Sequence, residues 1–188
     1  MNVRFLSILK RHKLKHLVEM KRGPKELGRV TGFVVDFSDS LILLHRLEWD
    51  TFRLNGYTVI REAEVSHYRF FDKAAYWQFR AVRLYRLAPR HPADISIASL
   101  VELLTSIASH FPLVTIHPER TKPDVCYIGS VSSVTERAVM IEDLNCSAEW
   151  TGPRRLKLAD ITKIDFGGGY EEALARTAPK RPEKMKIK

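Results

Sequence analysis

Cysteine is scarce in this chain of 188 residues, which contains only Cys126 and Cys146. They do not form a CxxC pair, and no histidine stands at metal-ligand spacing from either one. This scarcity argues against a disulfide framework and against a cysteine-based zinc site. It predicts two reduced thiols in a cytoplasmic protein.

Patterns typical of catalysis and of bound cofactors are also missing. There is no GxSxG, and the seven histidines, at positions 12, 16, 45, 67, 91, 110 and 117, form no HExxH or comparable arrangement. The glycine run 167–169 lacks the Lys-Ser/Thr of a P-loop and the spacing of a dinucleotide motif, so it indicates a flexible turn. We therefore expect a protein that is not an enzyme, with no cofactor, no metal and no small-molecule substrate.

Long apolar runs are absent, since none approaches the roughly 20 residues that a membrane-spanning helix needs. The apolar patch 3–9 is followed by basic residues at positions 10, 11, 13 and 15. A secretory signal has the opposite order, with its charges first. The sequence therefore predicts no membrane span and no export.

Positive charge is abundant and unevenly placed within a net charge of +9. Residues 1–92 contain 18 Lys/Arg against 9 Asp/Glu, whereas residues 93–175 contain 7 against 12. The tail from residue 176 is basic again, with 6 Lys/Arg and 1 Glu. A basic half joined to an acidic half favours an anionic partner for the first half. The alternative is that the basic surface serves solubility.

An internal repeat links the two halves of the chain. Residues 62–70 and 158–166 share a small residue, an acid, a β-branched residue and a hydroxyl residue in the same order, at an offset of 96. Further pairs follow at an offset of 97: Gly32 with Gly129, and the apolar run 41–44 with 138–141. Such an ordered series predicts one strand-rich unit laid down twice.

The pattern of apolar residues predicts the elements of both units. In the first unit it indicates a basic helix over 3–15, strands near 16–20, 29–37, 41–45, 58–61 and 66–70, and a helix over 73–87. In the second it indicates a helix over 97–107 with Asp94 or Ser96 as its N-cap, and strands over 113–116, 125–134 and 138–141. A strand around Leu156, a tight turn at 159–161, a strand over 162–166 and a helix over 171–176 complete the second unit. The expected domains are 1–90 and 91–177, followed by a disordered basic tail at 178–188.

The first unit resembles the Sm-like family of RNA-associated small β-barrels. The resemblance is carried by 32–44, where a glycine is followed by alternating apolar residues, an aspartate, a turn and another apolar strand, and by Ile60-Arg61. It implies a mainly β fold with short helices, built as two tandem five-stranded Sm-like or SH3-like barrels, each preceded by a helix. It also implies RNA contacts by the turn 36–39 and by Arg61. Glu62 stands where the family motif has glycine, which leaves the second turn in doubt.

Candidate binding residues gather in two segments. In the loop 46–57 they are Arg46, Trp49, Phe52, Arg53 and Tyr57, whose charges and rings suit single-stranded nucleic acid. The alternative is that Trp49 and Phe52 plug a barrel end. In the helix 73–87 they are Arg80, Arg83 and Arg86, which form a basic stripe or simply the solvated face of a linker helix.

Two functions remain open from sequence. The first is a protein-interaction or regulatory adaptor, in which the basic and acidic halves meet each other, in self-association, or meet a protein partner. The alternative is an RNA-binding or single-stranded nucleic-acid-binding module that uses the basic first unit.

Overall fold

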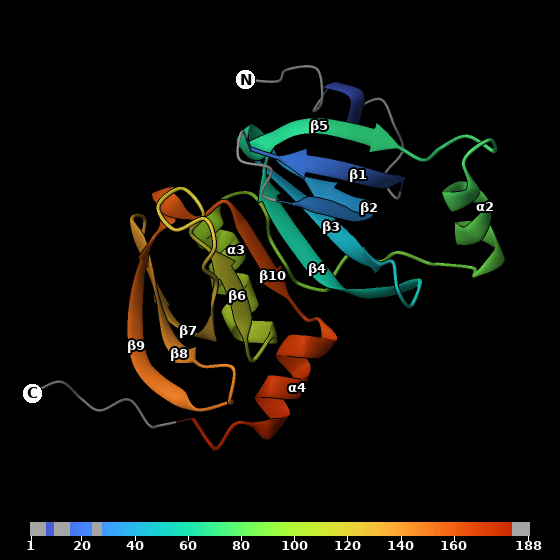
Figure 1. The fold of residues 1–188 in the computed structure, drawn as a ribbon. Helices are drawn as coiled ribbons and strands as arrows, with labels where there is room; N and C mark the ends of the chain where they lie inside the picture. The colour runs from blue at the N-terminus through green and yellow to red at the C-terminus, as the bar shows by residue number, and fades with distance from the viewer. Residues whose placement is uncertain (1–6, 10–15, 24–27, 182–188) are drawn as a thin grey trace, which may run out of the picture.

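A single antiparallel sheet of ten strands forms the frame of the protein in the computed structural model (Figure 1), which describes residues 7–9, 16–23 and 28–181. The strand order is β5-β1-β2-β3-β4-β10-β6-β7-β8-β9. In the first half the strands are β1 (Leu17–Arg22), β2 (Arg29–Phe37), β3 (Leu41–Glu48), β4 (Arg53–Arg61) and β5 (Val65–Phe70). In the second they are β6 (Val114–His117), β7 (Tyr127–Val134), β8 (Ala138–Leu144), β9 (Trp150–Lys157) and β10 (Lys163–Phe166).

Besides the helical residues 7–9, three helices and two 3-10 turns complete the described fold. They are η1 (Glu62–Glu64), α2 (Trp77–Leu84), α3 (Leu100–His110), η2 (Leu158–Asp160) and α4 (Gly169–Thr177). Apart from the helix expected over 3–15, most of which lies outside the described residues, the strand and helix predictions are confirmed in kind, and most boundaries fall within a few residues of those expected. None of the helices in the described part of the chain is long and apolar enough to cross a membrane.

The prediction of two closed five-stranded barrels is wrong, because the sheet is open and continuous. Its continuity comes from β10, which pairs with β6 on one side and with β4 on the other, from Ile60↔Lys163 to Tyr57↔Phe166. The expected tandem Sm-like or SH3-like barrels are thus replaced by one sheet whose edges are β5 and β9. Alternating apolar residues describe a half-buried strand, and they do not specify which neighbour its free edge will meet.

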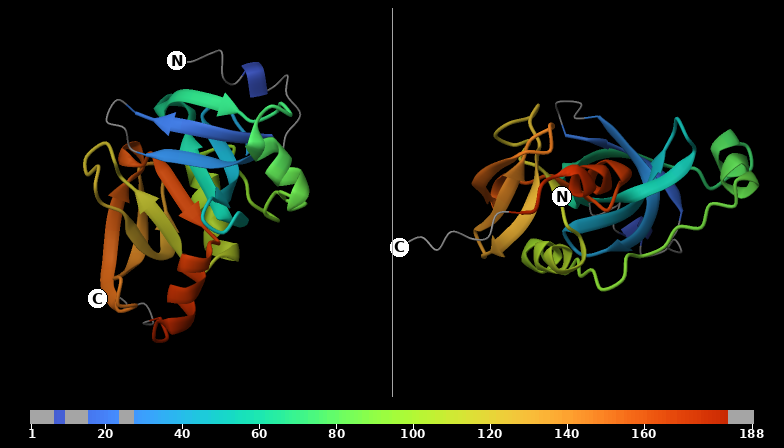
Figure 2. Two further views of the ribbon diagram at one scale, coloured as in Figure 1. Left: turned by 45° about the vertical axis from the view of Figure 1, so that its right-hand side comes forward. Right: turned by 90° about the horizontal axis from the view of Figure 1, so that it is seen from below.

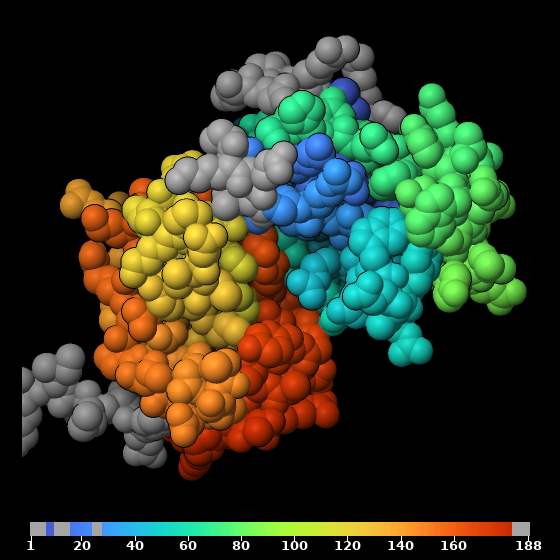
Figure 3. Space-filling view, in the orientation of Figure 1, coloured from blue at the N-terminus to red at the C-terminus, as the bar shows by residue number. Residues whose placement is uncertain are grey.

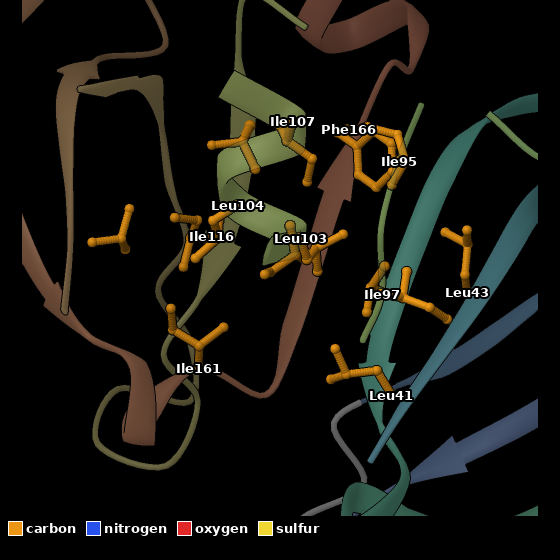
Figure 4. Close-up of a cluster of buried hydrophobic side chains, with 14 of the residues drawn as sticks. Leu41, Leu43, Ile95, Ile97, Leu103, Leu104, Ile107, Ile116, Ile161 and Phe166 are labelled. Carbon is orange, nitrogen blue, oxygen red and sulfur yellow. The ribbon is translucent and has the colours of Figure 1, made fainter. Parts of the chain in front are cut away.

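The largest apolar core combines residues from both halves of the chain. Figure 4 shows Leu103, Leu104 and Ile107 of α3 pointing toward the β10 and β6 side chains, with Leu41 and Leu43 beyond them from β3. All three α3 residues are fully buried in this shared core, so the packing of this helix stabilises the contact between the two halves of the sheet.

Helix α3 begins later than predicted. Its N-cap is Ser99, whose hydroxyl accepts a hydrogen bond from the Glu102 amide at 3.1 Å. Asp94 and Ser96, the expected caps, lie before it. The correct signal was the Ser-x-x-Glu capping box, in which a carboxylate three residues after the cap completes the first turn.

Polar side chains also join the halves. Arg22 Nη1 of β1 lies 2.6 Å from a Glu119 carboxylate oxygen, and both side chains are buried. The hydroxyl of Thr162 donates to the same carboxylate. Burial raises the pKa of Glu119, but the hydrogen bonds from Arg22 and Thr162 and nearby positive charge together lower it by more than burial raises it, so the net shift is downward. Arg120, the residue after Glu119, forms a second ion pair between the halves, with Glu64 at 2.7 Å.

Some predicted features lie outside the described residues. They include most of the basic helix expected over 3–15, and the tail from residue 182 onward. Cys126 and Cys146 are both free, as predicted, and both are exposed.

Candidate functional site

Three basic side chains stand side by side across strands β5, β1 and β2. In the strand registers, Lys21 lies opposite both His67 and Arg29. All three residues are exposed. In the next row, Glu19 lies opposite Arg69 and Thr31. We call Lys21, Arg29, His67 and Arg69 the basic face.

The local sequence explains why these side chains point outward. In β1, Val18 and Met20 are buried in an apolar cluster, so the alternating residues Glu19 and Lys21 face the other side of the strand. In β2, Val30 joins the same cluster. The period of two therefore places its neighbour Arg29 on the outer side, next to Lys21.

Two hollows border the basic face. The larger, of about 450 Å³, is lined by Lys21, Arg29 and His67 together with Arg22, Gly23, Gly28 and Ser66. The second, of about 320 Å³, shares Arg29 and is also lined by Arg46, Trp49 and Lys163. Figure 3 shows the β1–β2 surface (blue) beside the β3–β4 loop (cyan) and α2 (green) on one side of the molecule.

The charge balance of the basic face is strongly positive. Glu19 is the acidic residue of its two rows, and it is paired with Arg29 at 3.3 Å. Lys21 and Arg29 carry like charges directly opposite each other in an antiparallel pair, which reduces stability, so this pair favours an anionic ligand that neutralises it. Exposed cations beside a hollow can hold phosphate groups by charge-assisted hydrogen bonds.

The aromatic residues of the β3–β4 loop divide into a buried ring and an exposed one. Phe52 is 9 % exposed, with a φ of 50°, and packs against Trp49, Trp77 and Tyr85. It therefore fills an apolar cluster, although the open sheet has no barrel end for it to plug. Trp49 is 36 % exposed, and its indole N–H donates to the Thr31 hydroxyl at 3.2 Å.

Helix α2 is shorter than predicted, at 77–84 instead of 73–87, and Arg86 lies beyond its end with a φ of 51°. The basic stripe within the helix consequently consists of Arg80 and Arg83. Arg80 donates to the carbonyl oxygens of Ala74 and Ala75, at 2.8 and 3.3 Å. Views from the side and from below show α2 at the end of the molecule remote from β7–β9 (Figure 2).

The remaining candidates lie apart from one another. Arg53 is exposed at the start of β4. Tyr57 is half-buried and stacked between His45 and Phe166, with ring centroids 4.6 and 5.4 Å apart, and burial raises its pKa. Arg61 is also half-buried. The structure thus gathers Arg46 and Trp49 at one hollow, and it places Tyr57 and Arg61 inside the packing of the two halves.

Arg61 links β4 to the backbone of the segment around η2. Its Nε donates to the carbonyl oxygen of Ile161 at 2.6 Å, and its Nη2 donates to that of Leu158 at 2.7 Å. We expect Arg61→Ala to lower the free energy of unfolding by roughly 1–3 kcal/mol, because two charge-assisted hydrogen bonds are lost. Urea unfolding measures this change. A variant with wild-type stability but weakened ligand binding would contradict the structural role.

Sequence reasoning missed two of the four residues of the basic face, His67 and Arg69. Lys21 and Arg29 belong to a dense basic stretch of the sequence, but His67 and Arg69 lie about forty residues later and meet them only through strand pairing. The signal that was available is the strict alternation of β5, where exposed His67 and Arg69 flank Tyr68.

Comparisons with protein-family models, with curated proteins and with solved structures give no match. Within the described residues, no group of three or more His, Cys, Asp or Glu side chains is placed to hold a metal ion. The functional interpretation therefore depends on the geometry and charge of the basic face.

Proposed function

We propose that the protein binds a nucleic acid, and that its basic face contacts the phosphate backbone. The observation that supports this proposal is the row of Lys21, Arg29 and His67, which are adjacent across three strands and line one hollow. Neighbouring strands lie about 4.8 Å apart, so the row extends over about 10 Å. A single strand of a duplex carries about three phosphates over that length.

The second hollow extends the same surface. Arg46 and Lys163 add two cations beyond Arg29, and Trp49 adds an aromatic side chain at the rim. Lys163 is held 2.9 Å from the Asp165 carboxylate, so its charge is partly neutralised. Phosphate contacts of this kind position a nucleic acid without reading its sequence.

Binding should depend strongly on salt and on the basic face. We expect the double variant Lys21→Ala/Arg29→Ala to raise Kd roughly 10- to 100-fold for a fluorescein-labelled single-stranded RNA. Each lost phosphate contact should also reduce the slope of log Kd against log salt by about 1. Fluorescence anisotropy over a salt series from about 50 to 300 mM measures both quantities.

Arg137→Ala is the matched control, because Arg137 is an exposed cation in the β7–β8 turn, away from the basic face. Its Kd and salt slope should stay close to those of the wild type. Two results would refute the proposal: wild-type protein that does not bind at low salt, or equal losses in the Arg137 and the double variants.

A protein partner is the second candidate function, because Leu84 of α2 is 79 % exposed. This candidate keeps the adaptor hypothesis drawn from the opposite charges of the two halves. A large exposed apolar side chain is a contact that an apolar partner would cover. The Leu84 variant described below separates it from nucleic-acid binding.

A further inference from the structure

Aromatic rings form a connected surface between the β3–β4 loop and α2. The ring centroids of Trp49 and Trp77 are 5.6 Å apart, and buried Phe52 lies 6.2 Å from Trp77 and 5.0 Å from Tyr85. Trp77 and Tyr85 are 53 % and 60 % exposed. Phe52 thus packs against the exposed rings from the interior of the protein. We call Trp49, Trp77 and Tyr85 the ring surface.

The charges of the α2 segment beside the ring surface are all of one sign. Residues 76–90 contain Arg80, Arg83, Arg86 and Arg90 and no acidic residue. All four arginines are exposed, and the Arg83 guanidinium lies 5.9 Å from the Phe79 ring centroid. The centre of a protein-docking surface is usually depleted of charge, whereas exposed rings interleaved with cations suit bases and phosphates.

The ring surface is continuous with the basic face. Trp49 lines the same hollow as Arg29 and Arg46, and its indole N–H is held by Thr31 of β2. Trp49 also contacts Trp77 of α2. A ligand whose phosphates lie on the basic face therefore reaches exposed rings at the end of the hollow.

We infer that the ring surface stacks the unpaired bases of a single-stranded nucleic acid whose backbone lies on the basic face. This inference rests on the proposed function and adds the class of ligand. The bases of a duplex are stacked on one another and paired, so their faces are not available to Trp77 and Tyr85. A single strand exposes a π-face at every base, which makes stacking tolerant of sequence.

The test compares a fluorescein-labelled 15-nucleotide RNA, as a single strand and as its blunt duplex, by anisotropy at about 100 mM salt. Wild-type protein should bind the single strand at least about 10-fold more tightly than the duplex. Trp77→Ala/Tyr85→Ala should weaken single-strand binding roughly 10- to 100-fold, as expected from lost base stacking. Its affinity for the duplex and its salt slope should not change.

Two further variants make the result specific. Trp77→Phe keeps a ring and should retain most of the affinity. Leu84→Ser removes the neighbouring apolar side chain without touching a ring, and should leave RNA binding unchanged. Urea unfolding of each variant confirms that it is folded.

The possible outcomes separate this inference from the proposed function. Salt-dependent binding that is equal for duplex and single strand, or that is unaffected in Trp77→Ala/Tyr85→Ala, overturns the stacking and leaves the basic face as a phosphate-binding surface. A loss in Leu84→Ser equal to that in the ring variant indicates apolar docking and also overturns it. Absence of binding to either RNA overturns both proposals.

Discussion

Replacing Asp165 with alanine is expected to lower the free energy of unfolding by about 3–5 kcal/mol, because it removes one partner from a buried charged network. The Asp165 carboxylate accepts from the Thr58 hydroxyl at 2.6 Å and lies 2.8 Å from His117 Nε2 and 2.9 Å from Lys163 Nζ. These partners come from β4, β6 and β10. The variant would leave buried polar groups of three adjacent strands without their acceptor.

The network also predicts how the effect depends on pH. Burial raises the pKa of Asp165, but the His117 hydrogen bond, the Lys163 charge and the Thr58 hydrogen bond outweigh it and hold the pKa well below its ordinary value. Because the folded pKa lies below the unfolded one, the carboxylate stabilises the fold fully above about pH 5. This contribution decreases as the pH falls through the ordinary aspartate pKa. The difference between wild type and Asp165→Ala should therefore shrink between pH 7 and pH 3.

Urea unfolding at both pH values measures the prediction. Asp165→Asn, which keeps a hydrogen-bond acceptor of similar size but loses the charge, should show an intermediate loss. Glu172→Ala is the control for removing an acid, since Glu172 makes only an exposed ion pair with Arg176 on α4. It should change stability by less than about 0.5 kcal/mol. An Asp165→Ala protein as stable as the Glu172 variant would show that the network does not hold the strands together.

Replacing Gly129 with alanine is expected to lower the free energy of unfolding by about 3 kcal/mol. A Cβ at this position would lie 2.2 Å from the carbonyl oxygen of Glu142 and 2.9 Å from its carbonyl carbon. Both atoms are backbone of the neighbouring strand β8, so relief requires that the two strands move apart. Gly129 pairs with Asp143 inside that ladder, between Ile128↔Leu144 and Ser130↔Glu142, which places the result at the upper end of the range for overpacking.

Gly169→Ala is the matched control. At Gly169, the first residue of α4, a Cβ would meet only the Asn55 side chain, at 3.6 Å or more. An alanine in the first turn of a helix is favourable, so this variant should be as stable as wild type or slightly more so. Thermal or urea unfolding of both variants decides the matter. Equal stabilities for the two would mean that β7 and β8 can separate at little energetic expense.

Most strands were predictable because they depend on local patterns. The strand over 29–37 was predicted with its observed bounds. Helix α3 was predicted from its apolar spacing, although its first residue required the capping box at Ser99 and Glu102. Local alternation and capping act within a few residues, so they leave their signal in consecutive sequence.

The candidate site was predictable only in part. Trp49 and Arg46 were recognised and do line a hollow. Phe52 and Tyr57, in contrast, are packing residues, and Arg61 holds backbone carbonyl groups by hydrogen bonds. An arginine next to an aromatic residue gives the same local sequence in a binding loop and in a packed junction between the two halves. Burial and hydrogen-bond partners distinguish the two cases, and both are properties of the assembled chain.

The sequence by itself determined the β-rich elements and the uneven charge, because both depend on local sequence. Only the tertiary structure decided that β4 pairs with β10, so that one open sheet forms instead of two barrels. The same long-range pairing places His67 beside Lys21 and Arg29. A strand edge offers identical hydrogen-bonding groups to any partner, and the choice between partners depends on the packing of the whole chain.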